Sequence, residues 1–160
     1  MDTRKMTESL PGSEAVYEVE ESETQIRFRV SSDLWFVDCI IWEAEAFVHR
    51  LGTPVRGFSI VLRGLLRNAV SHGNWNDSSQ LVLCTVERTE DGFIQIRVEN
   101  EDEDFEYHHM NVTTTEAIKE IRDHGYAAIN TFFERLEFSP KGNRVSVCLR
   151  IVDSEIPANV

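Results

Sequence analysis

Apolar and polar residues alternate along four segments of the chain, which is the pattern of β-strands that bury one face. In the first segment Ile26, Phe28 and Val30 share one side, and the residues between them are polar. The turn sequence Glu-Asp-Gly at residues 90–92 joins the second and third segments and predicts a β-hairpin. The predicted strands cover residues 24–30, 80–88, 92–100 and 144–152.

Two further segments repeat their apolar residues every three or four positions and therefore predict amphipathic helices at residues 33–51 and 55–72. Ser32 or Asp33 can cap the first helix, because a short side-chain oxygen accepts an unpaired backbone N–H group. Gly52 is expected to end this helix in a left-handed conformation. The expected buried stripes are Leu34, Val37, Ile41, Ala44, Val48 and Leu51 in the first helix and Phe58, Val61, Leu62, Leu65, Leu66 and Ala69 in the second.

A third helix, or two helices broken near Gly125, is predicted over residues 114–136. The order of elements is then β-α-α-β-β-α-β. Strands with one apolar face need a covering layer, which amphipathic helices can supply. We therefore predict an α/β (α+β) fold, a two-layer sandwich in which three helices cover one face of a mixed β-sheet.

The N-terminal segment is acidic, rich in Ser and Thr, and lacks apolar periodicity, so it is expected to be disordered or docked on the body. Docking would use Val16, Tyr17 and Val19. The predicted divisions of the chain are an N-terminal tail at 1–23, one folded domain at 24–152 and a C-terminal tail at 153–160.

The chain has 160 residues and a formal net charge of −12, and its acidic residues are concentrated in two places. The first 24 residues hold seven acids and two bases, and residues 99–106 hold six acids and no base. The remainder is close to neutral and shows no basic patch. This distribution argues against nucleic acid as a partner.

The sequence also predicts a cytoplasmic protein that has no membrane partner. No apolar run approaches the ~20 residues of a transmembrane helix, and the first ten residues lack the apolar core of a secretory signal. The three cysteines, Cys39, Cys84 and Cys148, lie far apart without the spacing of a zinc site or a disulfide framework. A reducing compartment fits this pattern.

Trp35, Cys39 and Trp42 follow one another at i, i+4 and i+7 on the first predicted helix, away from its buried stripe. Exposed aromatic side chains often mark an interface. We therefore expect a protein-binding surface here, with a homodimer as the first candidate. The alternative is that the N-terminal tail or the sheet covers these side chains.

The string NAVSHGN at residues 68–74 resembles the N-box of the GHKL (histidine kinase-like) ATPase superfamily, and most closely that of the bacterial anti-sigma-factor serine kinases. Gly125-Tyr126, with the helix and last strand that follow, is similar to the second glycine box of that family. The resemblance extends in matching order over about residues 24–152. It implies a Bergerat-like fold, Mg-ATP as cofactor, serine kinase activity, and a sigma factor or anti-sigma antagonist as protein partner.

The resemblance also implies roles for individual residues. Asn68 would bind Mg²⁺ through its side-chain oxygen, and only together with ATP. Asn100 stands where the family has the aspartate that reads adenine. His72, Gly73 and Gly125 complete the nucleotide-binding positions, if these are retained.

Several positions depart from the family pattern. The glutamate that acts as general base, four residues before Asn68, is Gly64 here, and losing a positioned base costs ~10²–10⁴-fold in rate. The two glycines of the first glycine box are Asp102 and Asp104, and the earlier glycine of the second box is Asp123. Two like charges ~6 Å apart repel by roughly 3 kcal/mol at an effective dielectric constant of ~20, so these acids disfavour a triphosphate.

The sequence therefore predicts a degenerate GHKL domain that acts as an anti-sigma-factor-like regulatory module. In this interpretation ATP binding is weak or lost, catalysis is lost, and no catalytic residue is assigned. One alternative is an active ATP-dependent serine kinase that uses a substitute base from residues 101–106. Another is a scaffold dimer without a ligand.

Overall fold

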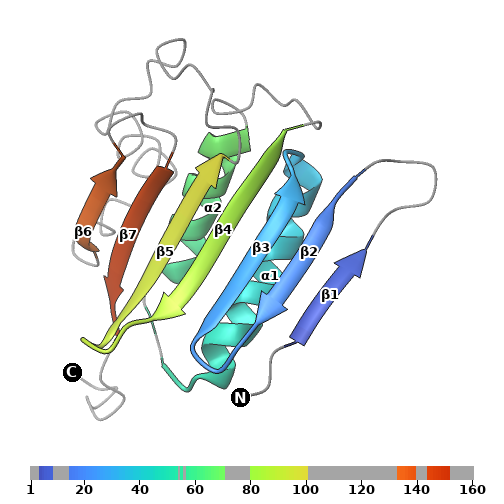
Figure 1. Cartoon of the computed structure of the whole chain (residues 1–160). Coiled ribbons are helices and arrows are strands. Elements are labelled where there is room, and N and C mark those ends of the chain that lie inside the picture. Colours follow the sequence, from blue (N-terminus) through green and yellow to red (C-terminus); the bar gives the residue numbers. More distant parts are fainter. Residues whose placement is uncertain are drawn as a thin grey trace.

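The computed structural model of the chain describes residues 4–8, 15–53, 55, 57–70, 80–100, 133–139 and 144–151. This part of the chain forms seven strands and two helices (Figure 1). In chain order they are β1 (Arg4–Glu8), β2 (Tyr17–Glu21), β3 (Gln25–Ser31), α1 (Leu34–Arg50), α2 (Phe58–Asn68), β4 (Leu81–Arg88), β5 (Phe93–Asn100), β6 (Phe133–Phe138) and β7 (Arg144–Arg150).

The described strands form one sheet in the order β1-β2-β3-β4-β5-β7-β6, and all neighbours in it are antiparallel. The prediction of a mixed sheet is therefore wrong for these strands. The reason is that two helices connect β3 to β4. α1 runs back along the sheet and α2 runs forward again, so β4 starts at the end of the sheet where β3 stops (Figure 1). A single helix would have returned the chain parallel to β3.

α1 and α2 lie side by side on one face of the sheet (Figure 1). In β5, the side chains of Ile94, Ile96 and Val98 are buried beneath the helices, and the residues between them are half-buried on the opposite face. The same alternation holds in β4 and β7. The fold is thus α+β, with a core between a sheet and a helical layer, as predicted in this coarse form.

The predicted third helix does not extend over residues 133–136. These residues belong to β6, which pairs antiparallel with β7 and contains an irregularity between Phe133 and Arg135. Pairing with β7 satisfies the backbone groups of this segment, and such tertiary pairing outweighs local helical periodicity. The remainder of that prediction, residues 114–132, lies outside the described residues, as do residues 153–160.

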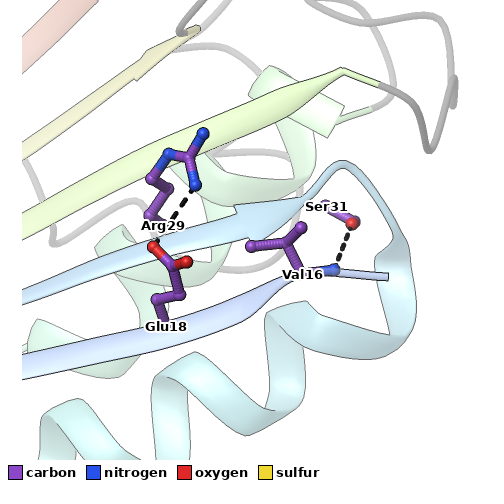
Figure 2. Close-up of polar contacts among 4 residues, drawn as sticks. All are labelled: Val16, Glu18, Arg29 and Ser31. Carbon is purple, nitrogen blue, oxygen red and sulfur yellow. Dashed lines mark hydrogen bonds and ion pairs between the residues drawn. The ribbon is translucent and has the colours of Figure 1, made fainter. Parts of the chain in front are cut away.

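The N-terminal segment contributes two strands to the sheet. Tyr17 and Val19 of β2 are buried in the core, so residues 15–21 lie against the body. Figure 2 shows two polar contacts that hold β2 on β3. The backbone N–H of Val16 donates to Oγ of Ser31 at 2.8 Å, and Nη1 of Arg29 lies 3.3 Å from Oε2 of Glu18.

α1 is capped as the sequence predicts. Oδ1 of Asp33 accepts a hydrogen bond from the backbone N–H of Trp35 at 2.9 Å, and Gly52 has a φ of 69° just beyond the helix end. Leu34 is expected in the buried stripe, but this residue is 44% exposed at the first position of the helix, where the preceding turn of helix that would flank it is missing. The buried residues of α1 are Phe36, Val37, Ile40, Ile41, Ala44, Phe47 and Val48.

α2 begins at Phe58, three residues later than predicted. Val55 instead makes an antiparallel bridge to Ile151, and Gly57 caps the helix with a φ of 73°. Five of the six residues of the predicted stripe are buried, and Ala69 is half-buried. Within the described residues, neither helix combines the length and the apolar character needed to cross a membrane.

Candidate functional site

The positions suggested by the N-box lie at the C-terminal end of α2. Asn68 is the last residue of this helix, and Gly64 lies one turn earlier. Residues four apart share a helix face, so position 64 is where a side chain could act beside position 68. Glycine supplies no side chain there. His72, Gly73 and Gly125 lie outside the described residues.

Asn100 is the last residue of β5, opposite Val82 of β4. Its side chain continues the row of β5 residues that faces the helices, and only 4% of the residue is exposed. Within the described part of the chain, its Oδ1 atom accepts no hydrogen bond. Leaving a buried amide oxygen unsatisfied costs about 1–3 kcal/mol. This oxygen is therefore an acceptor that a bound donor would stabilise.

The fold brings Asn68 and Asn100 to the same end of the molecule. α2 packs on β5, and the C-terminal ends of both elements point the same way (Figure 1). The two positions are 32 residues apart in the sequence. Two of the five proposed nucleotide-binding positions thus lie at the same end of the described fold.

The three proposed interface residues lie along the outer side of α1. Trp35 is 68% exposed and Trp42 is 77% exposed, while Cys39 between them is half-buried. Neither the sheet nor the N-terminal strands cover the two indole rings, so the alternative that these elements bury them is wrong. With Leu34, they are the large exposed apolar side chains of the described part of the chain.

Polar contacts hold α1 on both of its flanks. On the side of α2, Nη1 of Arg63 lies 2.6 Å from Oδ1 of Asp38, and the hydroxyl of Ser59 donates to Glu45. On the side of β2, Arg50 pairs with Glu21. The buried residues of α1 set its rotation about its axis, and these exposed contacts add little to its stability. The outer surface of the helix is left to the tryptophans.

A pocket of about 430 Å³ lies at the opposite end of the helical layer, where α1 turns into α2. Val48, Thr53 and Phe58 are its buried residues, and Glu45, His49 and Gly52 are its exposed ones. Thr53 is 6% exposed, and its Oγ1 atom has no hydrogen-bond partner in the described part of the chain. The sequence pattern gave no signal for this residue, because a loop threonine is usually exposed.

The cysteines of the sheet do not provide nucleophiles. Burial raises the pKa of the Cys84 thiol to about 12, and burial also raises the pKa of Cys148. The reactive form of cysteine is the thiolate, so both side chains remain inert thiols near neutral pH. Among the described residues, no group of three or more His, Cys, Asp or Glu side chains could hold a metal ion.

Two residues of the outer side of α1 were not singled out from the sequence. Ala46 and His49 are both exposed. They continue the spacing of Trp35, Cys39 and Trp42, so the signal was present in the sequence. It was missed because alanine and histidine are unremarkable on a helix surface, whereas tryptophan is not.

The chain matches no protein-family model, and no curated protein is similar to it.

Proposed function

We propose that the chain is a degenerate GHKL-like ATPase domain that acts as a regulatory protein-binding module, resembling an anti-sigma factor whose catalysis is lost. The observation that carries this proposal is Gly64, one turn before Asn68 in α2. A kinase of this type needs a carboxylate at that position to accept a proton. Without it, the rate of phosphoryl transfer falls by ~10²–10⁴-fold.

The described fold supports the proposal in its general features. An α-helical hairpin between β3 and β4 covers one face of an antiparallel sheet, and Asn68 and Asn100 come to one end of it. A helix within residues 114–132 would supply the third helix of the proposed GHKL-like fold. Gly125 would lie in that segment.

The residues of the site fit the two ends of Mg-ATP differently. The unsatisfied Oδ1 of Asn100 can accept a hydrogen bond from an amino group such as that of adenine. In the sequence, however, Asp102, Asp104 and Asp123 replace glycines that would face the phosphates. Added negative charge disfavours a triphosphate, even where Asn68 could hold Mg²⁺. We infer that Mg-ATP binding is weak or lost.

The partner in this proposal is a protein, of the sigma-factor or anti-sigma-antagonist type, in the cytoplasm. A module that has lost phosphoryl transfer can still regulate by sequestration, because binding alone removes the partner from its other complexes.

The loss of catalysis is tested by measuring hydrolysis of radiolabelled Mg-ATP by the purified chain and by its Asn68→Ala variant. We expect no turnover above background in either protein. We also expect no turnover in Gly64→Glu, since restoring one carboxylate leaves the acids at 102, 104 and 123 in place. Turnover by the unmodified chain that disappears in Asn68→Ala would contradict the proposal.

The second candidate is an active ATP-dependent serine kinase with a substitute base from residues 101–106. The observation that favours it is the buried acceptor of Asn100, which is suited to the amino group of adenine. The two candidates differ in the same hydrolysis assay, because only the kinase turns over ATP in a way that depends on Asn68.

A further inference from the structure

The outer side of α1 carries a regular seam that goes beyond the proposed function. Trp35, Cys39, Trp42, Ala46 and His49 follow one another at spacings of 4, 3, 4 and 3 residues. This is the spacing by which two helices pack together along a shared seam. In this chain both tryptophans of the seam are more than two-thirds exposed, and Cys39 between them is half-buried and also contacts the core.

Large and small residues alternate along the seam. Two indoles are each followed, four residues later, by a smaller residue: Cys39 after Trp35 and Ala46 after Trp42. In an antiparallel helix pair, facing positions have a constant sum of residue numbers. With Trp35 opposite the partner's Ala46, Cys39 falls opposite the partner's Trp42, so each indole meets a small residue. A parallel pair would instead place each tryptophan against its own copy.

We propose that the chain forms a homodimer in which α1 packs antiparallel against α1 of a second copy, in the register that sets Trp35 against the partner's Ala46. A two-fold axis between Cys39 and Trp42 relates the copies. The interface is then self-complementary, as a closed dimer requires. This dimer does not depend on nucleotide.

The exposed area of the seam is adequate for a dimer core. An aromatic side chain buries about 150–250 Å² when fully covered, so Trp35 and Trp42, at 68% and 77% exposed, offer roughly 300 Å² in each copy. Two copies contribute roughly 600 Å², about half of the ~1,200 Å² of the smallest stable interfaces. Leu34, Ala46 and His49 beside them supply further area.

The flanks of α1 carry more acids than bases, with Asp38, Glu43 and Glu45 against Arg50. Asp38 is paired with Arg63, and Arg50 is paired with Glu21. Association is opposed by the acids of the flanks and by the formal net charge of −12 on each copy, and salt screens both. Dimerisation is therefore expected to strengthen as the salt concentration rises.

Sedimentation equilibrium over a range of protein concentrations tests the dimer. We expect a monomer–dimer equilibrium whose dissociation constant rises at least tenfold in Trp42→Ala, as for an aromatic residue at the centre of an interface. Arg67→Ala, an exposed change on the neighbouring helix, serves as the control and should leave the constant unchanged. Far-UV circular dichroism and a thermal melt verify that each variant is folded.

A size swap tests the register. Ala46→Trp alone places two large residues opposite each other and should weaken the dimer at least tenfold. Combining Trp35→Ala with Ala46→Trp restores one large and one small residue at each contact, and should bring the constant back to within about threefold of the original. A chain that stays monomeric at all concentrations, or a dimer indifferent to Trp42→Ala, overturns the proposal. Failure of the swap to restore a dimer weakened by Ala46→Trp overturns the antiparallel register.

Discussion

Two regions of the molecule depart from the usual distribution of side chains, and they do so in opposite ways. One is the end where α2 and β5 stop, and the other is the outer side of α1. At the first, a polar group is buried: Asn100 is 4% exposed and its Oδ1 is unsatisfied in the described part of the chain. At the second, apolar groups are exposed, since Trp35 and Trp42 stand in solvent on a firmly held helix. A buried unsatisfied polar group lowers stability, and exposed tryptophans lower solubility. Each region therefore indicates a site that serves binding and not folding.

The comparison also separates two kinds of function. The α2–β5 end carries a buried acceptor, the Oδ1 atom of Asn100, and in the proposed function Gly64 leaves this end without the side chain that catalysis would need. The outer side of α1 has features of a macromolecular interface, and nothing in its sequence weakens them. The difference is the basis of the proposed function, in which the chain acts by binding a protein and not by catalysis.

The largest expected effect is a loss of stability that distinguishes the inner face of the helical layer from its outer face. Leu62 in α2 is fully buried, so Leu62→Ala should lower the free energy of unfolding by about 2–5 kcal/mol. Trp42→Ala should change it by less than about 0.5 kcal/mol in the monomer, because the ring is 77% exposed. Urea denaturation at a low protein concentration measures both. Equal losses in the two variants would show that Trp42 belongs to the core.

Asn100→Asp sharpens the description of the α2–β5 end. A carboxylate at this buried position lacks a donor among the described residues, so the pKa of the new acid should lie above its usual range. The folded variant then holds its proton more tightly than the unfolded chain. Compared with the unmodified chain, its stability should therefore be best preserved below about pH 4 and fall as the pH rises, with a loss of about 1–3 kcal/mol at pH 7.

The control for this substitution is Ser146→Glu, which adds the same charge at a half-buried position of β7, between Arg97 of β5 and Glu137 of β6. We expect little change in its unfolding free energy at any pH. If Asn100→Asp proves as stable as the unmodified chain at pH 7, a donor does reach that position, and the site is better suited to an anion than we infer.

The titration of Cys84 tests whether the sheet side of the core, between the two regions, excludes water. Burial raises the pKa of its thiol from 9.0 to about 12, so the folded chain retains a proton that the unfolded chain releases. The stabilising effect is complete below about pH 9 and is lost as the pH rises toward 12, with up to a tenfold change in the folding equilibrium per pH unit. Alkaline unfolding curves of the chain and of Cys84→Ala measure this difference, and identical slopes would contradict it.

The smallest expected effect concerns the pocket between α1 and α2. Thr53→Val keeps the shape of the side chain and removes the buried hydroxyl that has no partner among the described residues. We expect a gain of about 1 kcal/mol in unfolding free energy. Thr85→Val, a half-buried change on β4, is the matched control. A loss of stability in Thr53→Val would show that the hydroxyl is satisfied after all.

Much of the local structure was predictable because its causes are local. The alternation in β4 and β5, the cap at Asp33 and the left-handed Gly52 all follow from short-range rules, and the structure has each of them. Sheet topology was less accessible. The antiparallel pairing of β3 with β4 depends on how a helical hairpin returns the chain, and β6 forms because β7 is available to pair with it.

The candidate site was predictable to a similar degree. Sequence spacing identified the exposed tryptophans, because exposure on a helix follows from its period. It could not identify the unsatisfied oxygen of Asn100 or the buried hydroxyl of Thr53. Those depend on which groups the tertiary fold brings near, and no pattern along the chain encodes the absence of a donor.

Isothermal titration calorimetry with ATP and Mg²⁺ tests most directly whether the α2–β5 end has lost its ligand, with Asn68→Ala titrated beside the unmodified chain. We predict no saturable heat for either protein at millimolar ATP. Saturable binding by the unmodified chain that is abolished in Asn68→Ala would show a working nucleotide site and contradict the loss of ATP binding.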